Sequence, residues 1–426
     1  MAFPRTLTNQ ASVLVHSKNQ NVPVAESYNV HSATISSSTQ RSLRWLKSLT
    51  SKVVEVMLHL RRFALLTVIL CAWMATSLVL TACTGVTLRA KDGTIVYGRT
   101  MEWGTFDLHS RVNIISRGFK FTGQTPDGKP GLTWTAKYGV VGIDGVMKDI
   151  ILDGMNEKGM TVGLFYHPGF AEYQKYDPAQ ASDSIGPTDV GQYLLSTCET
   201  IEEARQALRK IHVVPVPEAA LGFVPPVHYM VTDPTGKQIV IEFLKGEMKI
   251  FDAPLGVITN APNYDWHETN LRNYINLSPV GLPDKKIGEL DFKALGGGSG
   301  MIGLPGDFTP PSRFIRAVAF SKSARPTVNG EDTMYELFRI LDNFNVPLGA
   351  AEGSGHEKTQ GMVSSTLWTT CYDTKNKVMY YHTAHNRRVR KLELSKIDFT
   401  HATECVHLPL DIEKKQDMLD ITPSGK

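Results

Sequence analysis

Residues 63–82 form a stretch of 20 residues without a charged side chain, and this stretch ends directly before Cys83. A pair of arginines precedes it and small residues close it. A basic start, an apolar centre and small residues at the end are the layout of a secretory signal peptide, which is removed from the mature protein. We therefore predict a signal peptide at residues 57–82 and a folded body that begins at Cys83.

Two other interpretations of this segment stay open. About 20 apolar residues also suffice to span a bilayer as a retained anchor. The four residues Leu80-Thr81-Ala82-Cys83 also resemble a lipobox, in which the cysteine thiol carries a diacylglyceryl group. All three interpretations carry the body across a membrane. We therefore expect an exported, periplasmic bacterial protein, with a lipid-anchored protein as the alternative.

The charge of the chain is unevenly placed. The formal net charge is +3, yet residues 1–62 hold eight Lys/Arg against two Asp/Glu, so residues 83–426 carry a net charge of −3. A body this close to neutral lacks the concentrated basic face that nucleic acid requires. We therefore expect no nucleic acid partner and favour a small-molecule substrate.

Strand-like runs outnumber helical runs after Cys83, and tight turns join them. An Asp-Gly turn between residues 83–90 and 94–103 is typical of a hairpin. The other expected strands are 111–117, 133–141, 160–166, 228–232, 238–243, 364–372, 377–383 and 388–394, with a further hairpin between 247–251 and 256–259. Helices are expected after a capping box at Thr200 and at 312–323 and 332–343. The pattern predicts an α+β fold of antiparallel sheets with helices packed on them.

One domain is expected at residues 83–410, because no repeat and no break in composition divides it. Residues 1–56 are rich in polar side chains, so we expect them to be disordered or an upstream extension, and 411–426 is expected to be a polar tail. Cys405 and His407 have no partner pair nearby, so the spacing does not favour a zinc site.

Cleavage before Cys83 would place a thiol and a free α-amine on one residue. The α-amine has an ordinary pKa of about 7.7–8.0, so it can act as a base near neutral pH. An N-terminal amine that activates the nucleophile of its own residue is a known route to covalent catalysis. Arg99, on the returning strand of the first hairpin, is expected to lie beside Cys83 and to lower the pKa of its thiol.

Five separated blocks carry a family resemblance: CTGVTLRAKDG, YGRTMEW, DGMNEKGMTVGL, GVITNAPNYDWH and GLPGDFTPPSRFIR. In this order they resemble the choloylglycine hydrolase family of N-terminal-nucleophile (Ntn) hydrolases, which includes bile salt hydrolases and penicillin V acylases. The resemblance implies a four-layer αββα sandwich, with two antiparallel sheets between helix layers. It also implies hydrolysis of a linear amide bond.

The same resemblance implies site residues at the positions that match. The implied catalytic residues are Cys83, Arg99, Glu102, Tyr166, Asn260 and Arg313. Cys83 matches the nucleophile, Asn260 the side-chain donor of the oxyanion hole, and Tyr166 the position whose backbone N–H is the second donor. Glu102 departs from the family, which usually has aspartate there, so its hydrogen bond to the N-terminal amine is in doubt.

Substrate choice is less constrained by the sequence. Trp103 resembles an aromatic pocket residue of exported members of the family, and Phe165, His167 and Phe170 are further candidates for the substrate cleft. The resemblance implies a hydrophobic N-acyl amide: a conjugated bile salt, penicillin V or an N-acyl homoserine lactone. It implies no metal or cofactor.

The resemblance also implies a homo-oligomer, often a tetramer. Removal of the predicted signal peptide would leave no stable membrane span. Two inactive alternatives compete with the amidase. One is a lipoprotein of the same fold in which a lipid blocks Cys83, and the other is a ligand-binding module without turnover.

Overall fold

The computed structural model describes residues 83–104, 107–351, 365–400 and 405–423. The predicted signal peptide at 57–82 and the segment 1–56 lie outside these residues. Within the described residues, every helix is too short or too polar to cross a membrane.

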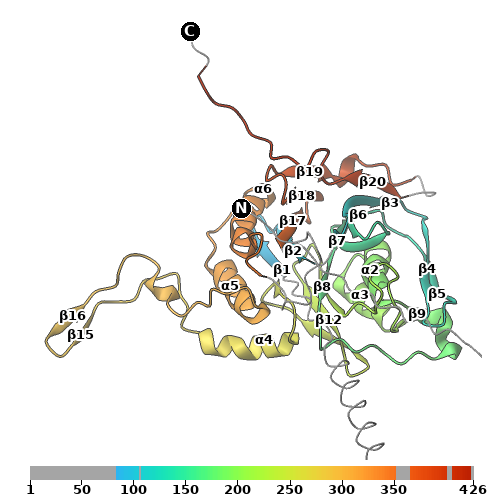
Figure 1. Ribbon diagram of the computed structural model, residues 1–426, viewed down its shortest axis with the longest axis horizontal. Helices are drawn as coiled ribbons and strands as arrows, with labels where there is room; N and C mark the ends of the chain where they lie inside the picture. Colours follow the sequence, from blue (N-terminus) through green and yellow to red (C-terminus); the bar gives the residue numbers. More distant parts are fainter. Residues whose placement is uncertain (1–82, 105–106, 352–364, 401–404, 424–426) are drawn as a thin grey trace, which may run out of the picture. The chain divides into compact units, whose positions relative to one another are not determined.

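A six-stranded antiparallel sheet begins with the predicted hairpin, which is confirmed (Figure 1). Its strand order is β14 (Val257–Ile258), β1 (Thr84–Arg89), β2 (Ile95–Trp103), β17 (Ser365–Asp373), β18 (Val378–Thr383) and β19 (Arg390–Glu393). The sheet therefore combines the start, the middle and the end of the described chain.

An eight-stranded antiparallel sheet forms the second layer. Its order is β13 (Glu247–Asp252), β12 (Gln238–Leu244), β11 (Val227–Thr232), β8 (Thr161–Tyr166), β7 (Ile150–Asn156), β6 (Val140–Gly145), β3 (Arg111–Ile115) and β20 (Val406–Pro409). Short two-stranded pairs are β4 (Lys120–Gln124) with β5 (Pro130–Thr135), β9 (Ser184–Ile185) with β10 (His212–Val213), and β15 (Lys285–Ile287) with β16 (Leu290–Phe292).

Helices cover the outer face of each sheet. They are α2 (Val190–Thr197), α3 (Ile201–Leu208), α4 (Tyr264–Leu271), α5 (Pro310–Ser323) and α6 (Gly330–Leu341), with 3₁₀ turns at Pro178–Asp183, Pro187–Asp189, Arg272–Tyr274, Ser299–Met301, Asp342–Phe344 and Leu394–Lys396. Helices α5 and α6 pack on β1 and β2 of the six-stranded sheet, and α2 packs on β7 and β8 of the other. Figure 1 shows α2 and α3 on one side of the strands and α5 and α6 on the other.

Side chains on opposite faces of one strand belong to different hydrophobic clusters of the core. In β8, Val162 and Leu164 pack in the cluster that contains α2 and α3, whereas Phe165 packs in the cluster that contains β1, β2, α5 and α6. Successive side chains of a strand point to opposite faces, so a sheet covered on both faces is apolar throughout. The layers follow the order helix, sheet, sheet, helix, and the predicted αββα sandwich is confirmed.

Two predicted strand assignments are wrong. The predicted strand 133–141 is divided into β5 and β6 by a bend, where the backbone at Gly139 lies against the ring of Phe399 and leaves no room for a Cβ. The predicted hairpin 247–251/256–259 does not form, because β13 pairs with β12 while β14 pairs with β1 in the other sheet. The chain changes sheets at this point, and this change brings the residues after β14 to the start of β1.

Candidate active site

Cys83 directly precedes β1 and is buried, with 2 % of its surface exposed. Its backbone N–H donates a hydrogen bond to Oδ1 of Asn260, at 2.8 Å. The two residues meet because β14 ends just before Asn260 and pairs with β1 at Gly85. In the full chain this nitrogen is the amide of the peptide bond to residue 82; after cleavage it would be an amine.

Arg313 lies in the first turn of α5 and binds the same groups. Its guanidinium donates to Asn260 Oδ1 at 2.7 Å, to Thr84 Oγ1 at 2.8 Å and to the carbonyl oxygen of Cys83. Burial lowers the pKa of Arg313 to about 10, against the opposing effect of Glu102 and Cys83. The side chain therefore stays charged at neutral pH and holds the backbone of Cys83 in place.

These donors fix the orientation of the Asn260 amide. Because Oδ1 accepts from both Cys83 and Arg313, Nδ2 must point to the other side, where it donates to the carbonyl oxygen of Tyr166 at 2.8 Å. An amide nitrogen carries two hydrogens. One bonds the carbonyl oxygen of Tyr166, and within the described residues no second acceptor contacts this nitrogen, so its other hydrogen is available to a ligand.

The backbone of Tyr166 faces the same region. His167 N–H bonds Pro226 O at 2.7 Å and Val227 N–H bonds the Tyr173 hydroxyl at 2.9 Å. Tyr166 and Val227 are thus a non-hydrogen-bonded pair of the β8–β11 ladder, in which the polar groups point away from the partner strand. The N–H of Tyr166 is therefore directed to the side on which Asn260 lies.

Arg99 reaches from β2 into the gap between β7 and β8. The ladder between these strands runs only as far as Asp153 and Gly163, and the guanidinium beyond it donates to the carbonyl oxygens of Leu152 and Leu164. The guanidinium also lies 4.4 Å from the ring centroid of Phe165. Arg99 thus supplies hydrogen bonds to carbonyl oxygens of β7 and β8 where these two strands no longer pair with each other.

The thiol of Cys83 is not acidic in this arrangement. Burial raises its pKa, and the lowering effects of Arg99, a backbone hydrogen bond from Glu102 and Arg313 do not cancel this rise. Arg99 lowers the thiol pKa, as predicted, but burial raises it by more, so the net pKa lies above its ordinary value. A buried neutral thiol needs a base.

Glu102 is held by two hydroxyl groups. Its Oε1 accepts from Thr366 at 2.7 Å and its Oε2 from Thr100 at 3.1 Å. Burial raises the pKa of the carboxyl to about 7, against the opposing charge of Arg313. Within the described part of the chain, the bond from the Cys83 nitrogen goes to Asn260 and not to Glu102.

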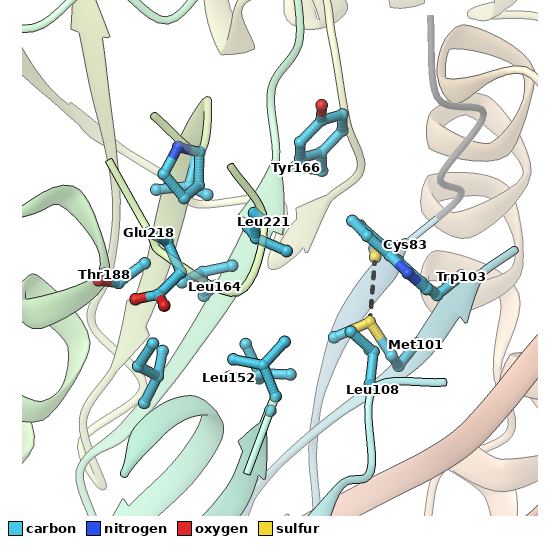
Figure 2. A pocket seen from close by; sticks show the side chains of 15 residues that line it. Cys83, Met101, Trp103, Leu108, Leu152, Leu164, Tyr166, Thr188, Glu218 and Leu221 are labelled. Atoms are coloured by element: carbon cyan, nitrogen blue, oxygen red, sulfur yellow. Dashed lines mark hydrogen bonds between the residues drawn. The ribbon is translucent and has the colours of Figure 1, made fainter. Parts of the chain in front are cut away.

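A largely apolar cavity opens at Cys83 (Figure 2). Its empty volume is about 630 Å³, including its solvent mouth. Met101 and Trp103 of β2 lie beside Cys83, and Tyr166 meets Trp103 edge-on at 6.0 Å between ring centroids. The walls continue through Leu152, Leu164 and Leu221 to Thr188 and Glu218.

Residues 83–408 match the model of the linear amide C–N hydrolases, choloylglycine hydrolase family. The chain belongs to the choloylglycine hydrolase family. As a member, it is an amidase that hydrolyses linear amides.

Relatives of the choloylglycine hydrolase family agree with this assignment. The chain is 34 % identical over 318 residues to a bile salt hydrolase/transferase of Clostridium perfringens, which covers 74 % of this chain and 93 % of the relative. It is 25 % identical over 325 residues to a penicillin V acylase of Pectobacterium atrosepticum, which covers 71 % and 78 %. The crystal structure of a mutant conjugated bile acid hydrolase from C. perfringens superimposes with a TM-score of 0.69 at 30 % identity, covering 80 % of this chain and all of the other.

The structure brings together all six residues that the choloylglycine hydrolase resemblance implied as catalytic. Trp103 lines the cavity, as expected of a substrate-cleft residue. Phe165, His167 and Phe170 do not line it, and the prediction of a cleft position for them differs from the structure. Phe165 points to the opposite face of β8 from Leu164, His167 is fully buried against His228, and Phe170 is exposed.

Twelve of the fifteen lining residues were not found from the sequence. Among them are Met101, Leu152, Leu164, Leu221 and Glu218. Met101 lies two residues from Arg99 on the same face of β2. The alternation of side chains along a strand could therefore have predicted that Met101 lies near the site. The others come from distant segments and carry no local pattern that marks a cavity wall.

His167, His228 and Glu242 place three ligand atoms within 4.8 Å of one another behind the site. The two imidazole rings are stacked 4.3 Å apart and parallel within 1°. In-plane lone pairs of parallel stacked rings do not converge on one ion. Both nitrogens of His228 are also engaged, with Thr259 O at 2.9 Å and Glu242 Oε1 at 3.2 Å. The cluster is better described as a hydrogen-bonded support for the segment that carries Asn260.

Proposed function

We propose that Cys83, once it is the N-terminal residue, is the nucleophile that hydrolyses a hydrophobic N-acyl amide through a thioester. The observation that carries this proposal is the convergence of Asn260 on Cys83. One amide side chain binds the nitrogen that would become the α-amine through its oxygen, and its nitrogen binds the backbone of Tyr166, whose N–H is the second expected donor.

The α-amine would serve as the base. The thiol proton passes to the amine nitrogen of the same residue, and the thiolate attacks the carbonyl carbon of the substrate. Arg313 shares Asn260 Oδ1 with this nitrogen, and a neighbouring cation disfavours the protonated amine. The amine is thereby kept neutral and able to accept the proton.

The oxyanion of the tetrahedral intermediate would be held by Asn260 Nδ2 and the Tyr166 N–H. Donors aimed at the developing charge lower the barrier because they need no reorganisation. When the C–N bond breaks, the leaving amine takes the proton from the α-ammonium group. Water then attacks the thioester, the α-amine accepts its proton, and the acid is released with the thiol restored.

The apolar cavity supports an acyl group of hydrophobic character. A conjugated bile salt, penicillin V and an N-acyl homoserine lactone all carry such a group on a linear amide. The names of the relatives cited above support the first two.

Export remains part of the proposal, because an N-terminal Cys83 requires removal of the residues before it. We propose cleavage of a signal peptide at 57–82 in a bacterial host, with release to the periplasm. A lipid on Cys83 would block both the amine and the thiol, and would leave a lipid-anchored protein without activity.

The deciding experiment is intact mass spectrometry of the protein secreted by an exporting host, followed by a panel of the three amides. We expect a mass that begins at Cys83 with a free thiol, and turnover of at least one amide. Cys83→Ser and Cys83→Ala should lose nearly all activity and keep the circular dichroism spectrum. A diacylglyceryl mass, or turnover by Cys83→Ala, would overturn the proposal.

A further inference from the structure

A buried carboxylate joins the two sheets beside Arg99, and the reaction proposed above does not use it. Asp153 of β7 is fully buried. Its Oδ1 accepts a hydrogen bond from the Tyr97 hydroxyl at 3.0 Å, and its Oδ2 accepts one from the Thr370 hydroxyl at 2.6 Å. Tyr97 and Thr370 belong to β2 and β17 of the six-stranded sheet, whereas Asp153 belongs to the eight-stranded sheet.

Both hydroxyl donors are immediate neighbours of Arg99. Tyr97 lies two residues before Arg99 on the same face of β2, and Thr370 is the residue opposite Arg99 in the β2–β17 pair. The guanidinium of Arg99 in turn donates to the carbonyl oxygen of Leu152, the residue before Asp153. Asp153 is therefore bound to two residues that adjoin Arg99, and Arg99 is bound to the residue that precedes Asp153.

The backbone of β8 leaves space for this contact. A Cβ at Gly163, the residue that pairs with Asp153, would lie 2.1 Å from the Tyr97 hydroxyl oxygen and 3.1 Å from Oδ1 of Asp153. Atoms that are not bonded do not approach as closely as the first of these distances, so glycine is the residue that fits here. The contact between Tyr97 and Asp153 is thus built into the neighbouring strand.

Charge is the second property that links Asp153 to Arg99. Within the described residues, the hydrogen bonds of Arg99 go to carbonyl oxygens and to the sulfur of Met101, so no carboxylate binds it directly. Burial lowers the pKa of Arg99, but nearby negative groups raise it by more, and among the carboxylates Asp153 contributes more than Glu102. A buried charge requires compensation by an opposite charge.

From these contacts we infer that Asp153 is a positioning residue of the amidase. It supplies the counter-charge of Arg99 and fixes the strands on either side of it, and so it limits how far Arg99 favours the thiolate of Cys83. The inference rests on the proposed function, in which the thiol of Cys83 is the nucleophile. A cysteine kept as a thiolate is open to oxidation, so a resting thiol that stays neutral until the α-amine takes its proton is protected.

The other groups that face Asp153 are neutral. Tyr97, Tyr372 and Cys371 lie on β2 and β17, and burial raises the pKa of each well above its ordinary value. Burial also raises the pKa of Asp153 to about 6, against the opposing charge of Arg99. Above pH 7 the charged groups at this point are therefore the Asp153 carboxylate and the Arg99 guanidinium.

The charges around Cys83 are balanced in the same way. Arg99, Glu102 and Arg313 are the charged groups that affect the pKa of its thiol. Glu102 is the carboxylate with the largest effect on the pKa of Arg313, and Asp153 has this place for Arg99. Removal of the Asp153 charge therefore leaves Arg99 without compensation beside the thiol, and the thiolate becomes more favourable.

A purely structural role competes with this inference. The carboxylate would then only join the two sheets, and its loss would lower stability without favouring the thiolate. Tyr97→Phe and Thr370→Val each remove one hydrogen bond to Asp153 and keep its charge. They are therefore the matched controls for Asp153→Asn, which removes the charge and keeps the shape. The hydroxyl groups of Tyr97 and Thr370 can also accept a hydrogen bond, so the amide fits between them.

The experiment measures the rate at which iodoacetamide alkylates Cys83 in the mature protein between pH 7.5 and 9.5. Peptide mass spectrometry distinguishes Cys83 from the other cysteines. We expect Asp153→Asn to react roughly three- to tenfold faster than wild type at a fixed pH, which corresponds to a thiol pKa lower by about half to one unit. Tyr97→Phe and Thr370→Val should keep the wild-type rates while they unfold at lower urea concentration.

An unchanged or slower rate in Asp153→Asn would overturn the inference, and so would an equal acceleration in both controls. If Asp153→Asn does not fold, Asp153→Ser replaces it, because serine is also neutral, and the same acceleration is expected. Alkylation requires no turnover. Failure of this inference is therefore distinguishable from failure of the proposed function, which the panel of amides tests with the same wild-type protein.

Discussion

Asn260 occupies a position in which one side chain has two separable roles. Its oxygen holds Cys83 and Arg313, and its nitrogen bonds Tyr166 and faces the site. Asn260→Asp keeps the acceptor and removes the donor, so we expect kcat to fall about 10²–10³-fold with little change in substrate binding. Asn260→Ala removes both roles and serves as the comparison. Steady-state kinetics would contradict the donor role if Asn260→Asp stayed fully active while Asn260→Ala did not.

Glu102 makes a prediction about pH. Burial raises its pKa to about 7 from an ordinary value of 4.5, so between these values the folded state binds more protons than the unfolded state. The contribution of Glu102 to the free energy of unfolding is therefore fully present below pH 4.5 and is lost as the pH rises towards 7. We therefore expect Glu102→Gln to flatten the fall of the unfolding free energy over this window, by at most about 1.4 kcal/mol per pH unit.

Urea unfolding between pH 4.5 and 7.5 measures this slope for Glu102. Glu247→Gln is the control. Lys249 lowers the pKa of the exposed Glu247 carboxyl, so its pKa shift has the opposite sign to that of Glu102. If the slopes of Glu102→Gln and wild type coincide, Glu102 does not titrate as its burial implies.

At the scale of single elements, local patterns predicted where strands and helices lie, but they did not predict which strands pair with each other. The first hairpin and α5 were predicted because alternation, an Asp-Gly turn and helical spacing are properties of adjacent residues. The partners of β13 and β14 were not, because the choice between neighbouring strands depends on which sheet each one completes. The bend at Gly139 depends on contact with Phe399, 260 residues later, and has no local signature beyond the glycine itself.

The turn between β6 and β7 gives a prediction at the same scale. Met147 is exposed and has φ of 55°, which L-residues adopt at a cost. Met147→Gly removes that cost, and we expect it to raise the free energy of unfolding by about 0.5–1 kcal/mol. Met147→Ala keeps the strain and is the matched control. Urea titration distinguishes the two, and an equal stability for both variants would contradict the strain.

The whole molecule assembles the site from segments that are distant in sequence. The bond from Cys83 to Asn260 spans 177 residues and that from Arg313 to Cys83 spans 230. Residue spacing alone does not bring such segments together, so the candidate catalytic set came from the family resemblance. The cavity could not be predicted in this way, because its walls combine residues of strands β2, β7 and β8 with residues of loops, and their positions depend on the packing of both sheets.

A final prediction concerns the β15–β16 hairpin, which in Figure 1 lies at the end of a long excursion away from the sheets. Leu290 and Phe292 are more than half exposed there. Exposed apolar patches mark interaction sites, and the family resemblance implies a homo-oligomer, so we propose that the hairpin contacts a second copy. The double variant Leu290→Asp/Phe292→Asp should then lower the mass measured by light scattering on a sizing column. The same change at an exposed tail residue, Ile421→Asp, should leave the mass unaltered. A monomeric wild type at micromolar concentration, or an unchanged mass in the double variant, would refute this role of the hairpin.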